Sequence, residues 1–221
     1  MDIYLLHIET ATKVCSVALS CNGKLIASKE TDDSNYVHGE VLTLFIQDLM
    51  AETKVSLQQL SAISVASGPG SYTGLRIGVS TAKGLCFALG IPLIAVDSLI
   101  SLAYLAKKNG VSQAICAMID ARRMEVFSAI YDNNLQLIKP ISADILDENT
   151  YGQFEPFTAI GDGAAKVGEI WSSRNIAIDT TIQSSAVGQI ELAFIKFNEQ
   201  NFENVAYFEP FYLKDFVSTK K

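Results

Sequence analysis

Ser67-Gly68-Pro69-Gly70-Ser71-Tyr72-Thr73-Gly74-Leu75-Arg76-Ile77-Gly78 is the most informative stretch of the chain. The apolar run 63–66 before it predicts a short buried strand, and the pattern over 74–89 after it predicts a helix. The stretch is therefore the turn at which a strand gives way to a helix.

The glycine loop within this stretch has two open interpretations. Gly68 and Gly70 permit positive φ and a close approach of the backbone, and Ser71 and Thr73 are natural helix caps. Free amides at such a helix start hold phosphate groups in many proteins. The loop lacks the lysine of a Walker-type site, which slightly favours a tight turn that binds nothing.

The residues around the loop predict alternating strands and helices. Strands are expected over 3–9, 14–20, 25–30, 63–66 and 92–96, and helices over 37–52, 74–89 and 98–107. Asn22-Gly23 is a strong signal for a hairpin between the second and third strands. Three strands followed by helix, strand, helix, strand and helix describe a ribonuclease-H-like lobe.

The second half of the chain partly repeats the first. Ile119-Asp120 precedes Asn133-Asn134 by the same spacing that separates Ile8-Glu9 from Asn22-Gly23. Later elements are fewer, with a strand expected over 176–178 and a helix over 185–198. We therefore expect an α/β protein with mixed sheets and the two lobes of actin-like ATPases, near 1–100 and 101–221, the second lobe being reduced.

Composition restricts the partners and the compartment. The formal net charge is −7, whereas a protein that binds nucleic acid alone needs a basic surface. The longest apolar region, 85–96, is interrupted by Gly90 and Pro92 and is too short to cross a bilayer. No targeting segment is recognisable, so we expect a cytoplasmic protein without membrane contact. The four cysteines have no metal-binding spacing and are expected to be buried thiols.

The glycine-rich stretch, together with its continuation to Leu93, closely resembles the TsaB (YeaZ) family. Further matching segments, in the expected order, are His38-Gly39-Glu40, Ile119-Asp120-Ala121-Arg122-Arg123, Glu125-Val126-Phe127 and Pro210-Phe211-Tyr212-Leu213-Lys214. The resemblance implies an actin-like fold and a scaffolding role in the synthesis of threonylcarbamoyladenosine in tRNA. It also implies a TsaD-type catalytic partner, a TsaE-type ATPase, and contact with tRNA only within that complex.

Two departures bear on chemistry. The family usually has Asp where this chain has Glu9, which makes nucleotide binding through Glu9, Gly68, Gly70, Ser71 and Thr73 a weak expectation. The His-x-x-x-His pair of TsaD-type proteins falls here on Ser98 and Leu102, and leucine cannot ligate a metal. We expect no metal, no cofactor and no catalytic residue. The alternatives are a small-molecule kinase or ATPase of the actin-like superfamily, and a glycoprotease-like metallopeptidase.

Two helices are expected to form a partner surface. Apolar residues cover well over half of the helix over 37–52, and small residues line one face of the helix over 74–89. We expect contacts with the TsaD-type subunit, or with a second copy when the chain is alone. The expected interface residues are Val41, Leu42, Phe45, Leu49, Gly74, Gly78 and Thr81. Arg122 and Arg123 are candidates for an RNA or partner contact, or for a solvated hairpin.

Overall fold

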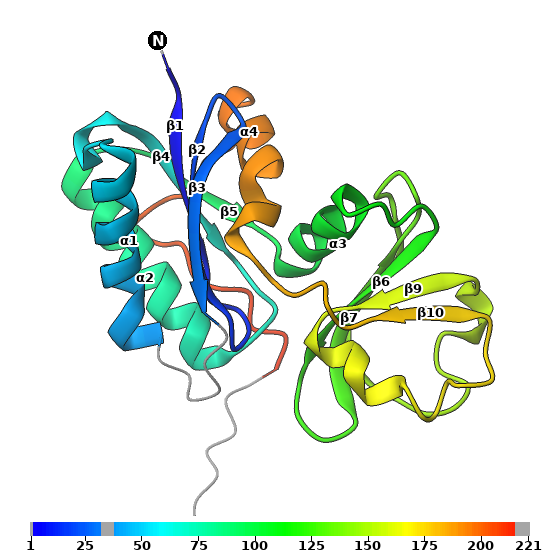
Figure 1. The fold of residues 1–221 in the computed structure, drawn as a ribbon. Helices are drawn as coiled ribbons and strands as arrows, with labels where there is room; N and C mark the ends of the chain where they lie inside the picture. The colour runs from blue at the N-terminus through cyan, green and yellow to red at the C-terminus, as the bar shows by residue number, and fades with distance from the viewer. Residues whose placement is uncertain (1, 32–37, 215–221) are drawn as a thin grey trace, which may run out of the picture.

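The computed structural model describes residues 2–31 and 38–214, which form two lobes, each built around a five-stranded mixed sheet (Figure 1). Val37, where the first helix was expected to begin, lies outside the described residues. Among the described residues, no helix is long and apolar enough to cross a membrane.

The first sheet has the strand order β3-β2-β1-β4-β5. Helices α1 and α2 cover one face, and α4 covers the opposite face (Figure 1). Along β1 the side chains alternate between these layers: Leu6 and Ile8 pack beneath α1 and α2, whereas Leu5 faces α4. The elements of this lobe are β1 (Tyr4–Glu9), β2 (Cys15–Cys21), β3 (Lys24–Thr31), α1 (His38–Thr53), η1 (Leu57–Gln59), β4 (Leu60–Ala66), α2 (Tyr72–Leu89), β5 (Leu93–Val96), η4 (Ala186–Gln189) and α4 (Ile190–Asn198).

The second sheet repeats this topology with the order β10-β9-β6-β7-β8. One face packs against α3, and the other packs around the fully buried Trp171. The elements are α3 (Ser98–Lys108), β6 (Ala114–Asp120), β7 (Glu125–Tyr131), β8 (Leu137–Ile145), η2 (Gly152–Phe154), β9 (Phe157–Ile160), η3 (Asp162–Val167) and β10 (Ile176–Asp179). Short 3-10 turns stand where the first lobe has α1 and α2, so the expected two-lobed, actin-like fold with a reduced second lobe is confirmed.

The expected division of the chain at residue 100 does not follow the packing. Ala193 of α4 is buried against Leu5, Ala62 and Ile94 of the first sheet, so the chain returns to the first lobe after β10. Helix α3 packs instead on β6 and β7 of the second lobe. The first lobe thus comprises roughly 2–97 and 184–211. The periodicity of the sequence locates helices, but it carries no information about which sheet each helix covers.

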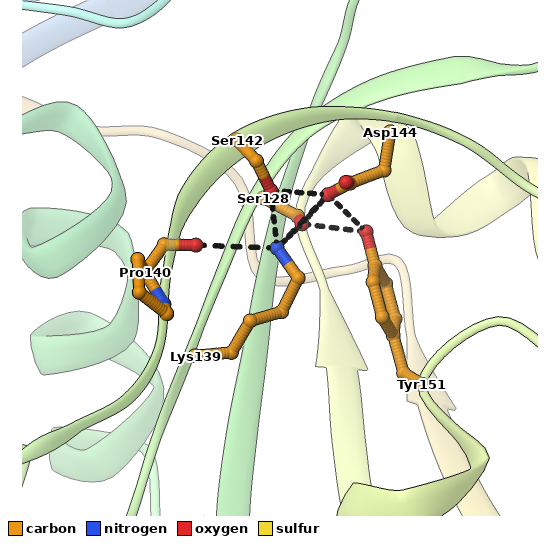
Figure 2. A network of polar contacts seen from close by, with 6 residues as sticks. All are labelled: Ser128, Lys139, Pro140, Ser142, Asp144 and Tyr151. Atoms are coloured by element: carbon orange, nitrogen blue, oxygen red, sulfur yellow. Dashed lines mark hydrogen bonds and ion pairs between the residues drawn. The ribbon is translucent and has the colours of Figure 1, made fainter.

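A polar network on β7 and β8 stabilises the second sheet at its edge (Figure 2). Asp144 accepts hydrogen bonds from Tyr151 at 2.7 Å and Ser128 at 2.9 Å, and pairs with the Lys139 ammonium at 2.9 Å. Burial by itself would raise the pKa of Asp144, but these hydrogen bonds, with one from Ser142, lower it. The Lys139 ammonium is paired with the Asp144 carboxylate. The network therefore links β7, β8 and Tyr151 through hydrogen bonds and one ion pair.

The start of α2 is pressed against the turn that follows β1. Ser71 donates its backbone amide to Ala11 O at 2.6 Å, and the Thr10 hydroxyl donates to Gly74 O at 2.8 Å. A Cβ at Gly74 would overlap Thr10 O, and one at Gly78 would overlap the Thr10 hydroxyl. The glycines of this stretch are therefore required by close packing within the chain.

Two alanine substitutions on α2 should change stability in opposite directions. Gly74→Ala places a methyl group against the Thr10 carbonyl and should lower the free energy of unfolding by about 1–3 kcal/mol, as overpacking does. Gly84 has open space around its Cβ position, so Gly84→Ala should raise it by up to about 1 kcal/mol through helix propensity. Urea unfolding of the isolated proteins measures both values. Equal effects of the same sign would contradict the packing described for Thr10.

Candidate functional site

A cleft of about 460 Å³ lies between the lobes, where the β1–β2 turn faces the β6–β7 turn. The glycine loop contributes Gly70, Ser71 and Thr73 to its wall, whereas Glu9 and Gly68 lie outside it. The cleft is lined by Ala11, Thr12, Lys13, His38, Gly70, Ser71, Tyr72, Thr73, Gly74, Ile77, Ile119, Asp120, Ala121, Arg122, Phe127, Asp162, Tyr212, Leu213 and Lys214.

Backbone of the same chain packs closely against two glycines of the loop. A Cβ at Gly68 would come within 2.6 Å of Phe211 O, and one at Gly70 would overlap the Ala11 carbonyl. The Ser71 hydroxyl accepts the Gly74 amide at 3.2 Å as the N-cap of α2. These contacts favour the interpretation of the loop as a packed turn.

Glu9 is 1% exposed and faces the interior of the first lobe. Its carboxylate accepts the Ala11 amide at 2.8 Å and the Gln189 side-chain amide at 3.3 Å. Burial raises the pKa of Glu9 to about 7. The carboxyl group is thus held away from the cleft and contributes no charge to its wall.

A buried hydrogen-bond chain connects the same glutamine to His7. The Gln189 carbonyl oxygen accepts the Ser64 hydroxyl at 2.8 Å, and the His7 ring lies 2.7 Å from both Ser64 and Ser20. Burial lowers the pKa of His7 to about 3, so the ring is neutral. Gln189 was not recognised in the sequence, because a single amide without a motif gives no local signal.

Opposite charges pair along the cleft wall. Asp120 forms an ion pair with Lys166 at 2.6 Å, and Asp162 accepts the Asp120 amide at 2.9 Å. Burial raises the pKa of Asp162. Lys13 and Arg122 face the cleft from its two turns, which gives a polar wall of mixed charge. Among residues 2–31 and 38–214, no group of three or more His, Cys, Asp or Glu side chains could hold a metal ion.

Two polar side chains of the cleft wall, Ser71 and His38, form hydrogen bonds within the chain. The Ser71 hydroxyl caps α2, and His38 Nε2 lies 2.8 Å from Thr12 O. This contact holds the His38 ring against the β1–β2 turn. Burial lowers the pKa of His38.

The C-terminal segment 209–214 crosses the front of the cleft from the first lobe to the second. Phe211 donates its amide to Ser67 O at 2.7 Å, and the Tyr212 ring lies 4.7 Å from the ring of Tyr72. Lys214 then pairs with Glu125 of the second lobe. This segment narrows the cleft and supplies part of its wall.

The outer face of α1 and α2 is a second candidate site, and here the structure corrects several expected residues. Leu42, Leu49, Gly74 and Gly78 are buried within the first lobe, and Gly78 meets Thr10 of the same chain. These four residues cannot contact a partner while the lobe is folded. Val41, Phe45 and Thr81 are half-buried and lie at the margin of the exposed face.

The outer face carries large apolar side chains that the sequence analysis did not single out. Phe87 on α2 is 86% exposed and Leu44 on α1 is 55% exposed. Gly84 and Ala88, also exposed, leave room beside Phe87. A helical-wheel analysis could have found Phe87, because it lies off the buried stripe of Leu75, Val79, Ala82 and Cys86.

Arg122 and Arg123 form the β6–β7 turn, both with positive φ, at 73° and 49°. The Arg122 amide donates to the Asp120 carboxylate at 2.6 Å, which holds the turn. Arg122 borders the cleft and Arg123 is exposed. The cleft, the helix face and this basic turn are the three candidate sites for a function.

Comparison with known proteins places these features in a family. Residues 33–214 match the family model described as TsaD, tRNA N6-adenosine threonylcarbamoyltransferase. The chain is 28% identical to the tRNA threonylcarbamoyladenosine biosynthesis protein TsaB of Haemophilus influenzae, over 100% of this chain and 97% of that protein. It is 29% identical to the protein of the same name from Escherichia coli, over 98% of this chain and 97% of that protein.

A solved structure agrees with these relatives. YeaZ from Pseudomonas aeruginosa superimposes with a TM-score of 0.83 and 28% identity, covering 96% of this chain and 100% of that one. The fold and the site thus define a two-lobed α/β protein of the actin-like class. The chain belongs to the TsaD-type threonylcarbamoyltransferase family and, within it, to the TsaB (YeaZ) family, whose curated members are named for threonylcarbamoyladenosine biosynthesis in tRNA.

Glu9→Gln should alter the pH dependence of stability. The folded state raises the pKa of Glu9 from 4.5 to about 7, because the buried carboxyl group is more stable when protonated. The contribution of this group to the free energy of unfolding is therefore complete below pH 4.5 and is lost as the pH rises through 7. Glutamine cannot ionise, so the variant should gain on the wild type between pH 4.5 and 8 by on the order of 3 kcal/mol. Urea unfolding at several pH values measures the difference, and a difference that does not change with pH would contradict the burial of an ionisable Glu9.

Proposed function

We propose that the chain is a non-catalytic subunit that binds a TsaD-type catalytic subunit and supports assembly with a TsaE-type ATPase. The complex would transfer a threonylcarbamoyl group to adenosine in tRNA. The observation that carries this proposal is the exposure of two large apolar side chains, Phe87 on α2 and Leu44 on α1. Large exposed apolar side chains grouped on a folded protein are typical of partner surfaces.

The residues at two positions of α3 support a scaffolding role. Ser98 and Leu102, at the positions that match the histidine pair of TsaD-type proteins, are each 1% exposed and packed in α3. Neither position offers an imidazole, and the Ser71 hydroxyl is committed to capping α2. We infer that the catalytic residues belong to the partner.

Charge supports contact with tRNA only inside the complex. A chain with a formal net charge of −7 repels a polyanion unless a basic partner supplies most of the contacts. The Arg122-Arg123 turn is the local basic feature that we propose for an auxiliary contact. It lies on the second lobe, and Arg123 in it is exposed.

The same outer face would pair two copies of the chain when the partner is absent. A self-complementary helix face generates a two-fold dimer, and this dimer competes with binding of the catalytic subunit. Sedimentation should then show that addition of the TsaD-type protein converts the homodimer into a heterodimer.

Phe87→Ser should weaken binding of the cognate TsaD-type protein. Loss of a central aromatic anchor costs about 2 kcal/mol or more, which is about thirtyfold in Kd. Ile145→Ser is the matched control, because Ile145 is 77% exposed on β8 of the other lobe. Calorimetric titration measures both affinities, and thermal unfolding confirms that both variants fold. Equal affinity of the Phe87 variant and the wild type would remove the proposed surface.

A further inference from the structure

The C-terminal segment 204–214 links the two lobes at the front of the cleft, in addition to the two direct crossings of the chain. The direct crossings lie between β5 and α3 and between β10 and η4, and α3 and η4 pack on each other beside them. A Cβ at Gly188 of η4 would come within 2.6 Å of Ser101 O of α3. Two crossings with close packing beside them form a hinge about which the lobes can turn.

The segment is attached to the first lobe at several points. The Lys83 ammonium of α2 donates to Ala206 O at 3.2 Å and to Phe208 O at 2.8 Å. The Phe208 side chain packs on the apolar core beneath α1 and α2. Closer to the cleft, the Phe211 amide donates to Ser67 O at 2.7 Å. The segment is therefore held on the first lobe before it reaches the second.

Leu213 and Lys214 attach the segment to the second lobe. Leu213 packs against the apolar cluster that includes Ile119 and Phe127, and Lys214 pairs with Glu125 at the start of β7. The Lys214 side chain is 45% exposed, and ion pairs in such positions are weakened by water and salt. Attachment to the second lobe therefore depends on one partly buried apolar contact and one exposed ion pair.

Little buried surface stabilises the segment as a whole. Every residue from 204 to 214 is exposed or half-buried, and these residues form no helix and no strand. Segments with few buried contacts detach at a lower free energy than the core needs to unfold. Each lobe has a buried apolar core of its own, which does not include the segment's exposed end. The segment can therefore detach from the second lobe while both lobes stay folded.

We infer that segment 204–214 is a latch, whose contacts at Leu213 and Lys214 keep the cleft closed and whose release lets the lobes turn about the hinge. Opening should be visible between the two turns that face each other across the cleft. Lys13 lies on the β1–β2 turn and Met124 on the β6–β7 turn, and both are exposed. The inference concerns the chain by itself and does not depend on the proposed function.

Spin labels on these two turns test the inference in the full-length protein. Cys21 is the one cysteine that is not buried, so Cys21→Ser gives a background in which Lys13→Cys and Met124→Cys carry the labels. Pulsed dipolar spectroscopy measures the distances between them, and one short distance should predominate in this background. Leu213→Ser with Lys214→Met should add a longer distance. The ratio of open to closed molecules should rise about tenfold or more, because an apolar contact and an ion pair are lost.

Two further variants make the test specific. Glu125→Gln breaks the same ion pair from the second lobe and should raise the ratio by up to about fivefold, even if the double substitution disturbs the fold. Tyr207→Ser changes an 83% exposed side chain of the segment that precedes both anchors, and should leave the distances unchanged. Thermal unfolding checks that each variant folds. Unchanged distances in the folded variant that lacks both anchors, or equal opening by Tyr207→Ser, would overturn the inference.

Discussion

Close packing of the β1–β2 turn against the start of α2 is the constraint on which this structure depends. The Thr10 carbonyl and hydroxyl and the Ala11 carbonyl occupy the space where side chains would stand at Gly70, Gly74 and Gly78. Because a side chain at these positions would overlap the groups that face them, only glycine fits there. The two hydrogen bonds across the contact, from Ser71 to Ala11 and from Thr10 to Gly74, set the position of the helix.

This contact divides α2 into an inner and an outer face. The inner face packs on β4, on β1 and on the β1–β2 turn, which leaves no room for a partner at Gly74 or Gly78. The outer face of α2 carries the exposed Phe87 and open space at Gly84, and Leu44 is exposed on α1. The same packing fills the glycine loop with the chain's own backbone. The glycines of this motif therefore serve the packing of α2 on the rest of the lobe.

Much of the fold was predictable, since hydrophobic alternation and the Asn22-Gly23 turn locate the strands of the first sheet. The repeat in the second half likewise predicted the second sheet. Two kinds of information were missing. Whether α4 covers the first or the second sheet depends on contacts between distant residues such as Leu5 and Ala193, and no local pattern records them. The sequence also did not determine whether the glycines on α2 face a partner or the interior of the lobe, because glycine suits a partner interface and an intrachain contact equally well.

The partner surface stays a prediction, and several of its expected residues were wrong for a related reason. Helices α1 and α2 were identified correctly as carrying unusual apolar coverage, but Leu42 and Leu49 belong to the core, and Phe87 is the exposed residue. Gln189, which connects His7 to Glu9, lies far from both in the sequence and became visible only in the folded structure.

The proposed function lies on the outer face of α1 and α2 and not in the cleft. The most direct test is threonylcarbamoylation of tRNA by the reconstituted complex at limiting concentration of this chain. A cleft variant, Lys13→Met with Asp162→Asn, is compared with a face variant, Leu44→Ser with Phe87→Ser. The account predicts near-wild-type rates for the cleft variant and a loss of about tenfold or more for the face variant, restored at high concentration as weakened binding requires. A folded cleft variant that abolishes modification, while the face variant retains it, would contradict the account.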